Sequence, residues 1–167
     1  MKKVRIETIE NEVQPAAVMR KLTGPLGLTE MAINYYELEP GDSFAFAYHD
    51  HEVQEEVFYI QQGTATFETE DGPIEVTAGE ILRFGRHELQ RGWNYGDERV
   101  VALALGAPLA YGEMRKLRDC EDCDEPTHNE LQREEEADGT AVVVGYCTEC
   151  GSETGRWYRG SMDGSVP

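Results

Sequence analysis

Short runs of apolar and β-branched residues, separated by turn residues, recur along the first two thirds of the chain. Such runs are typical of strands, because β-branched and aromatic side chains suit a pleated, half-buried surface. No stretch sustains the 3.6-residue spacing of an amphipathic helix, so the pattern predicts an all-β fold of the sandwich or barrel type. The expected strands occupy residues 32–38, 44–48, 57–60, 64–69, 74–76, 80–84, 88–93 and 99–105.

Two histidines, His49 and His51, follow the second of these runs. On a regular strand their side chains would share one face, because successive side chains alternate. Glu56 lies at the start of the next expected strand and can face back toward them, whereas Glu55 has the opposite parity and should point to solvent. Two imidazoles and one carboxylate form a facial ligand set for a divalent first-row metal ion. The alternative is a pair of histidines that only form hydrogen bonds inside a barrel.

The segment around these histidines resembles the first sequence motif of the cupin superfamily, whose members are small jelly-roll barrels. A second cupin motif can be laid on residues 79–94, where Gly79 and Asn94 fall in register. The resemblance covers residues 31–110 and implies a cupin-type barrel. The residues that carry the first motif are Gly41, His49, His51, Glu56 and Gly63.

The second motif departs from the family pattern at three positions. Gly85 stands where proline is usual, His87 where glycine is usual, and Gln90 where the family has its last metal-binding histidine. A glutamine amide oxygen can ligate a metal ion, but it is a weaker donor than imidazole for late first-row ions. We expect His87 on the rim of the pocket. The resemblance implies a centre for iron, manganese, nickel or zinc formed by His49, His51, Glu56 and Gln90.

All four cysteines lie in two Cys-x-x-Cys pairs, which are Cys120 with Cys123 and Cys147 with Cys150. Each pair can present two thiolates to one Zn²⁺, and two pairs make a four-thiolate structural site. The intervening segment has a turn at 138–139 flanked by apolar residues, so it resembles a zinc ribbon, a unit too small to fold without its metal. Two alternatives to a zinc site exist. Disulfides are disfavoured in a cytosolic chain, which leaves a redox dithiol as the remaining one. With four thiolates available, His128 is expected at the surface.

These features predict one domain of ordinary size with a small C-terminal unit. Residues 1–30 are rich in proline, glycine and charge, which favours a cover of strand and turns over the barrel. The full predicted order is a cover at 1–30, a cupin barrel at 31–112, a linker at 113–118, a zinc-ribbon-like module at 119–160 and a tail at 161–167.

The net charge of the chain indicates the solvent in which the protein works more than its mechanism of action. The chain has 33 acidic and 15 basic residues, a net charge of −18, and only four of its cations are lysines. This composition looks like that of a protein from a salt-in halophile, where salt screens the repulsion between carboxylates. The alternative is a negative field that attracts cations or a basic partner. Nucleic acid is not an expected partner, because phosphate binding needs a basic surface.

The N-terminus lacks the apolar core of a signal peptide, and no window of 18 residues is apolar, so we expect a cytoplasmic protein without a membrane partner. Three classes of function fit the sequence. The first is a cupin-type metalloenzyme, a dioxygenase, isomerase or lyase that binds a small molecule at the open metal positions. The second is a non-enzymatic binding or sensing barrel whose zinc ribbon contacts a partner protein, and the third is a barrel with no occupied site. The cupin resemblance also implies a homodimer.

Overall fold

A computed structural model describes residues 1–160, and the tail predicted at 161–167 lies outside the described residues. The described part is almost entirely β, which confirms the all-β prediction, and its helical elements are the short η1 (Ile6–Thr8) and α1 (Thr23–Leu26). No helix within this part is long and apolar enough to cross a membrane. The strands are β1 (Val18–Lys21), β2 (Ala32–Leu38), β3 (Tyr48–His49), β4 (Glu55–Gln62), β5 (Thr64–Thr69), β6 (Ile74–Thr77), β7 (Ile81–Phe84), β8 (Gln90–Trp93), β9 (Val100–Ala107), β10 (Lys116–Cys120), β11 (Glu125–Glu135), β12 (Ala141–Cys147) and β13 (Glu153–Tyr158).

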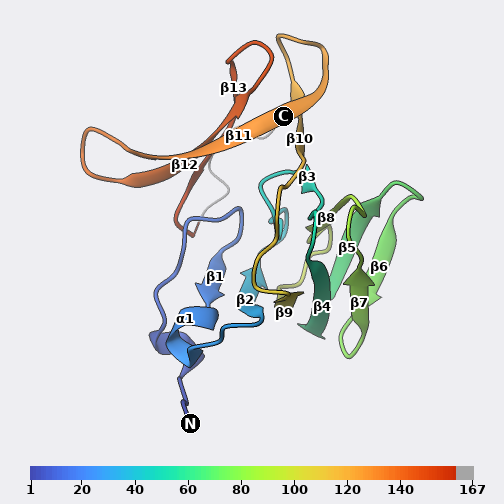
Figure 1. Cartoon of the computed structure of the whole chain (residues 1–167), viewed down its shortest axis with the longest axis vertical. Coiled ribbons are helices and arrows are strands. Elements are labelled where there is room, and N and C mark those ends of the chain that lie inside the picture. Colours follow the sequence, from blue (N-terminus) through green and yellow to red (C-terminus); the bar gives the residue numbers. More distant parts are fainter. Residues whose placement is uncertain (161–167) are drawn as a thin grey trace.

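The strands form two antiparallel sheets whose apolar faces enclose the core of the barrel (Figure 1). One sheet has the order β1-β2-β9-β4-β7, and the other has the order β13-β12-β11-β10-β3-β8-β5-β6. Phe58 from β4 and Phe67 from β5 belong to different sheets, yet their ring centroids lie 4.8 Å apart. Both rings are almost fully buried. Alternation along each strand therefore supplies one inward, apolar face per sheet, and the two faces pack on each other.

The clearest departure from the predicted strands is at residues 44–48. Only the last residue of that run, Tyr48, is in a strand, because β3 covers Tyr48 and His49 alone. The Ser43 hydroxyl bonds to the backbone of Ala45 at 2.9 Å and also donates to the Gly92 carbonyl at 2.9 Å. Such local bonds compete with the strand ladder, which explains the loop between Ser43 and β3.

Gly63, one of the cupin-motif glycines, forms the tight connection between β4 and β5. Its φ of +75° lies in the left-handed region, which glycine adopts without steric cost. A Cβ atom at this position would lie 2.6 Å from the carbonyl oxygen of Arg99, so a side chain is excluded on two grounds.

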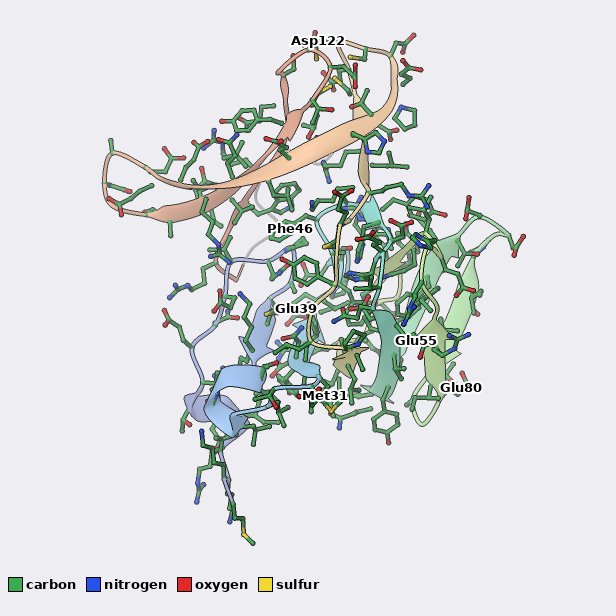
Figure 2. All side chains as sticks on the ribbon, viewed as in Figure 1. Met31, Glu39, Phe46, Glu55, Glu80 and Asp122 are labelled. Atoms are coloured by element: carbon green, nitrogen blue, oxygen red, sulfur yellow. The ribbon has the colours of Figure 1, made fainter. Side chains whose placement is uncertain are left out.

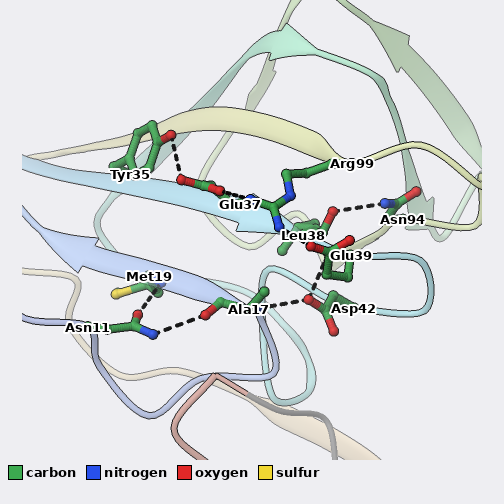
Figure 3. Close-up of polar contacts among 10 residues, drawn as sticks. All are labelled: Asn11, Ala17, Met19, Tyr35, Glu37, Leu38, Glu39, Asp42, Asn94 and Arg99. Atoms are coloured by element: carbon green, nitrogen blue, oxygen red, sulfur yellow. Dashed lines mark hydrogen bonds and ion pairs between the residues drawn. The ribbon is translucent and has the colours of Figure 1, made fainter. Parts of the chain in front are cut away.

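The segment before β2 is held against the barrel by a buried carboxylate. Asp42 accepts a hydrogen bond of 2.7 Å from the backbone N–H of Ala17 (Figure 3). Asn11 braces the same turn, since its side-chain oxygen accepts from the N–H of Met19 and its amide donates to the carbonyl of Ala17 (Figure 3). β1 then adds to the edge of the five-stranded sheet by pairing with β2.

The C-terminal strands continue the eight-stranded sheet of the barrel. β10 pairs on one side with β3, where Lys116 lies opposite His49, and on the other side with β11. β10 begins at Lys116, so the second half of the linker predicted at 113–118 is already part of the sheet. Figure 1 shows β11 and β12 as a long curved hairpin over the barrel.

The C-terminal strands pack onto the barrel through Trp157 of β13, a side chain with no exposed surface. Its ring centroid lies 4.9 Å from that of Phe46, which lies between the hairpin and the barrel in Figure 2. Val13 from the N-terminal segment and Val143 from β12 belong to the same buried cluster. One apolar cluster thus joins the N-terminal segment, the barrel and the C-terminal strands.

Replacing Trp157 with alanine should lower the free energy of unfolding by about 3–5 kcal/mol, the usual cost of emptying a buried aromatic site. Urea unfolding of the full chain measures this change. Ile81→Ala removes a large apolar side chain that is 66% exposed and serves as the control, with an expected effect within about 0.5 kcal/mol. Equal effects of both variants would contradict a docked hairpin.

Candidate metal centres

His49, His51 and Glu56 converge from different parts of the fold on one point inside the barrel. β3 places His49 directly opposite Gln90 of β8, so these two side chains project to the same face of the sheet. His51 lies in the loop after β3, and Glu56 comes from β4 in the facing sheet. The ligand atoms of the two histidines and Glu56 all lie within 4.8 Å of one another. The structure therefore brings together the three residues that the motif predicts, although His51 lies outside the strand.

The separations between these atoms fit a divalent ion. Oε2 of Glu56 lies 3.5 Å from Nε2 of His51 and 3.9 Å from Nε2 of His49. Metal–ligand bonds of about 2.1 Å place adjacent donors about 3.0–3.4 Å apart, so a small inward shift is sufficient. His51 is buried, and neither of its ring nitrogens has a hydrogen-bond partner among the described residues. Since an unpaired buried polar atom costs about 1–3 kcal/mol, an ion here would satisfy donors that the fold leaves unpaired.

His49 is held in the form that binds metal ions. Burial lowers its pKa below the ordinary value, against the opposing charge of Glu56, so the imidazole is neutral at neutral pH. Its Nδ1 lies 3.1 Å from the carbonyl oxygen of Ala47, which assigns the proton to Nδ1. The lone pair of Nε2 then faces Glu56, as a metal ligand requires.

Gln90 occupies the place of the family's fourth ligand and is almost fully buried. Its Nε2 donates to Oε2 of Glu56 at 2.9 Å and lies 3.4 Å from Nε2 of His49, while its Oε1 is buried without a hydrogen-bond partner among the described residues. In this orientation the amide positions Glu56. A half-turn of the carboxamide would exchange its oxygen and nitrogen and present Oε1 to the centre.

Two acidic or basic neighbours of the centre point elsewhere. The side chain of His87, expected at the pocket rim, is exposed in the turn after Gly85 and is not among the residues that line the cavity. His87 contacts the histidine loop through its backbone, because its N–H donates to the carbonyl of His51 at 3.0 Å. Glu55 is exposed and pairs with Arg83 at 2.7 Å, as its parity predicts.

A cavity of about 880 Å³ lies beside the triad. The barrel, the N-terminal segment and Leu131 of β11 form its walls, and Ala45 and Ala47 leave space near the histidines. Tyr36 also lines the cavity, and burial, with a smaller effect of the Glu56 charge, raises its pKa so that the phenol stays neutral. Asn34 and Tyr36 lie two residues apart on β2 and so share the face that meets the cavity. The sequence predicts the strand at 32–38 but does not show which of its faces lines a pocket.

Asp50, between the two histidines, has a role that the sequence analysis missed. Its buried carboxylate accepts a hydrogen bond of 2.8 Å from Nε of Arg115 and one of 3.2 Å from the Arg115 backbone. Burial would raise the pKa of Asp50, but these bonds outweigh it and hold the pKa below its ordinary value. The pair ties the histidine loop to the segment between β9 and β10, from which Tyr111 and Met114 line the cavity. The two partners are 65 positions apart, so no local pattern in the sequence marks this pair.

The four cysteines form a second cluster, at the end of the sheet away from the barrel, with all four sulfurs within 4.8 Å of one another. Sγ of Cys120 lies 3.5 Å from that of Cys150, Sγ of Cys123 lies 3.8 Å from that of Cys147, and none is in a disulfide. Four sulfurs with bonds of about 2.3 Å to a tetrahedral ion lie about 3.8 Å apart, so the cluster could hold one zinc-sized ion.

The surroundings of this cluster favour the thiolate form at two of its four cysteines. Hydrogen bonds with Ser152 lower the pKa of Cys150, whereas burial raises the pKa of Cys120 and hydrogen bonds with neighbouring thiols raise that of Cys123. A hydrogen bond with the Thr127 side chain lowers the pKa of Cys147 to about 6. His128 is exposed on β11 and does not belong to the cluster, which agrees with its expected place at the surface.

Comparison with known proteins identifies the barrel. Residues 34–106 match the family model of the cupin domain. No curated protein matches the sequence. Among solved structures, a sugar phosphate isomerase of the cupin superfamily from Silicibacter pomeroyi aligns with a TM-score of 0.60 and 16% identity, over 89% of this chain and 94% of that one.

Two further structures are similar. A putative sugar phosphate isomerase from Acidithiobacillus ferrooxidans aligns with a TM-score of 0.55 and 22% identity, over 96% of this chain and 85% of that one. The polyketide cyclase RemF from Streptomyces resistomycificus aligns with a TM-score of 0.59 and 23% identity, over 75% of this chain and 91% of that one. At these identities the likeness establishes the fold and leaves the activity open. With the family match and the motif glycines, it shows that residues 34–106 form a cupin domain.

Proposed function

We propose that this protein is a cupin-type metalloenzyme. His49, His51 and Glu56 would hold one divalent ion of iron, manganese, nickel or zinc, with Gln90 beside it. A small molecule with oxygen donors would bind next to the ion in the cavity. The observation that supports this most directly is the convergence of His49, His51 and Glu56 beside a cavity of about 880 Å³, with both ring nitrogens of the buried His51 lacking a hydrogen-bond partner among the described residues.

When bound, such an ion supplies Lewis-acid polarisation of a ligand oxygen, or a redox centre if it is iron. The chain's own residues do the rest. Gln90 holds the Glu56 carboxylate in place by the 2.9 Å hydrogen bond. The neutral phenol of Tyr36 can donate a hydrogen bond to a bound oxygen atom. Buried apolar side chains such as Phe44 and Phe58 in the cavity wall keep water away from that oxygen.

A non-enzymatic binding or sensing protein is the second candidate. It is favoured by the direct connection between the two clusters, since β10 runs from Lys116, opposite His49, to Cys120. A change at the barrel centre would then be transmitted to the C-terminal strands, where a partner protein could read it. Turnover of a small molecule separates the two candidates.

We further propose that the four cysteines bind one structural zinc ion. Four thiolates complete a tetrahedron and leave no open position for a substrate, so this ion would serve folding. The homodimer, the cytoplasmic location and the halophilic setting stay predictions from the sequence.

Elemental analysis of the purified protein should give two metal equivalents per chain. The double variant His49→Ala/His51→Ala should retain one equivalent, because it removes two of the three strong ligands of the barrel ion. His87→Ala/His128→Ala removes two exposed histidines and should retain both ions, which makes it the matched control. One equivalent in the wild-type protein and in both variants would overturn the barrel centre.

Neighbouring glutamates allow a second test of the same site. Glu56→Gln should weaken binding of the barrel ion by at least about tenfold, because the anionic donor becomes neutral. Glu55→Gln, one residue earlier on the outer face of β4, should leave the affinity unchanged. Competition with a chelator of known affinity measures both, and equal effects would contradict Glu56 as a ligand.

Replacing Cys147 with serine should remove one zinc equivalent and loosen β11, β12 and β13. Hydrogen exchange should then show faster exchange in these strands, while β4 and β9 in the barrel keep their protection. The exposed Glu149 provides a control, since Glu149→Gln lies within the same Cys-x-x-Cys pair without supplying a ligand. Unchanged zinc content in Cys147→Ser would rule out the four-thiolate site.

A further inference from the structure

The charges around the cavity are balanced except at one lysine, Lys116. Its ammonium group forms no ion pair and no hydrogen bond with the residues that the structure describes. This holds although Lys116 is half-buried and the chain has more than twice as many acidic as basic residues. The charged side chains that line the cavity, apart from the histidines, are Glu10, Glu12, Lys21, Glu56 and Lys116.

The other charged lining residues have partners. Glu10 lies 3.0 Å from Arg159, and Lys21 lies 3.3 Å from Glu12. Glu56 belongs to the metal triad. A lysine without a partner would usually extend into water, where hydration stabilises its charge. At the wall of a cavity, the missing counter-charge can instead come with the ligand.

The register of the sheet aims Lys116 at the barrel centre. Lys116 lies directly opposite His49 in the antiparallel pair of β10 and β3, and Gln90 lies opposite His49 on the other side. Directly opposite residues project to the same face, so Lys116, His49 and Gln90 form a row across three adjacent strands. The preceding residue, Arg115, is fixed by its bonds to Asp50, which holds the start of β10 in place.

Lys116 also lies outside the residues that match the cupin domain, which end at residue 106. It reaches the cavity only because the C-terminal strands extend the barrel sheet. The cation is therefore a feature of this chain's own extension and is independent of the motif that supplies the metal ligands.

We propose that Lys116 binds an anionic group, a carboxylate or a phosphate, on a small ligand whose other end coordinates the ion in the barrel. The ligand class is therefore a metal-chelating small molecule with a second anionic group. This inference rests on the proposed metal centre. The carboxylate and phosphate sources share the chemistry of a charge-assisted hydrogen bond to an ammonium group.

Three probes that share one chelating unit, a 2-hydroxycarboxylate, test the proposal by calorimetric titration of the metal-loaded full chain. Glycolate has this unit alone, malate adds a carboxylate, and 3-phosphoglycerate adds a phosphate. Malate or 3-phosphoglycerate should bind at least about tenfold more tightly than glycolate, as a charge-assisted bond provides. Which of the two binds more tightly identifies the anionic group.

Lys116→Met should abolish this preference, leave glycolate affinity within about threefold and keep the metal content unchanged. Lys116→Arg should restore most of the preference, because it retains the charge. Lys21→Met, which removes a paired lysine of the same cavity, should keep the preference. The preference should also weaken as salt is raised, because ions screen the contact.

The two proposals fail in different ways. A wild-type protein without barrel metal overturns the proposed function, and a Lys116-dependent preference in that protein would still support the role of the lysine. Full metal content with equal affinities for the three probes overturns the role of Lys116 alone. A preference for malate or 3-phosphoglycerate that survives in Lys116→Met also overturns the role of Lys116.

Discussion

The arrangement of the whole molecule depends on the pairing of β3, a strand of two residues. His49 in this strand is bound laterally by β8, which supplies Gln90, and by β10, which supplies Lys116. A strand this short has few hydrogen bonds of its own, so its position is imposed by the neighbours on both sides. The same pairing makes the C-terminal strands an extension of the barrel sheet, and the Trp157 cluster secures them there. The backbone of His49 is therefore held between two distant parts of the chain, β8 and β10.

Features encoded by short spacing could be predicted from the sequence. The two histidines and Glu56 were assigned to one centre from parity and motif spacing, and the cysteines to another from their paired spacing. Gly63 follows from the same motif, and its close approach to Arg99 explains why the motif has glycine there. In each case the residues concerned are close together in the sequence, so the local backbone conformation determines how they are placed.

Features that depend on pairing between distant segments could not be predicted. Asp50 and Arg115 are far apart in sequence, and nothing local to either residue indicates that they form an ion pair. Lys116 was assigned to a linker, because its place opposite His49 follows only from the order of strands in the sheet. The loop at Ser43 is a smaller case, in which one hydroxyl outweighed an aromatic, strand-like run. The alternation of a sequence predicts which face of a strand a side chain occupies. The pairing of the strands determines which other side chains it contacts on that face.

The bridge between Val13 and Arg159 has a consequence for biosynthesis. The N-terminal segment leaves the ribosome first, yet its final contact is with a residue near the end of the described chain. All the strands of the cupin domain are synthesised before β13, so they can fold while the mouth of the cavity still lacks its C-terminal wall. Leu131 of β11 therefore joins the cavity wall after the strands that carry His49 and Glu56 have been synthesised.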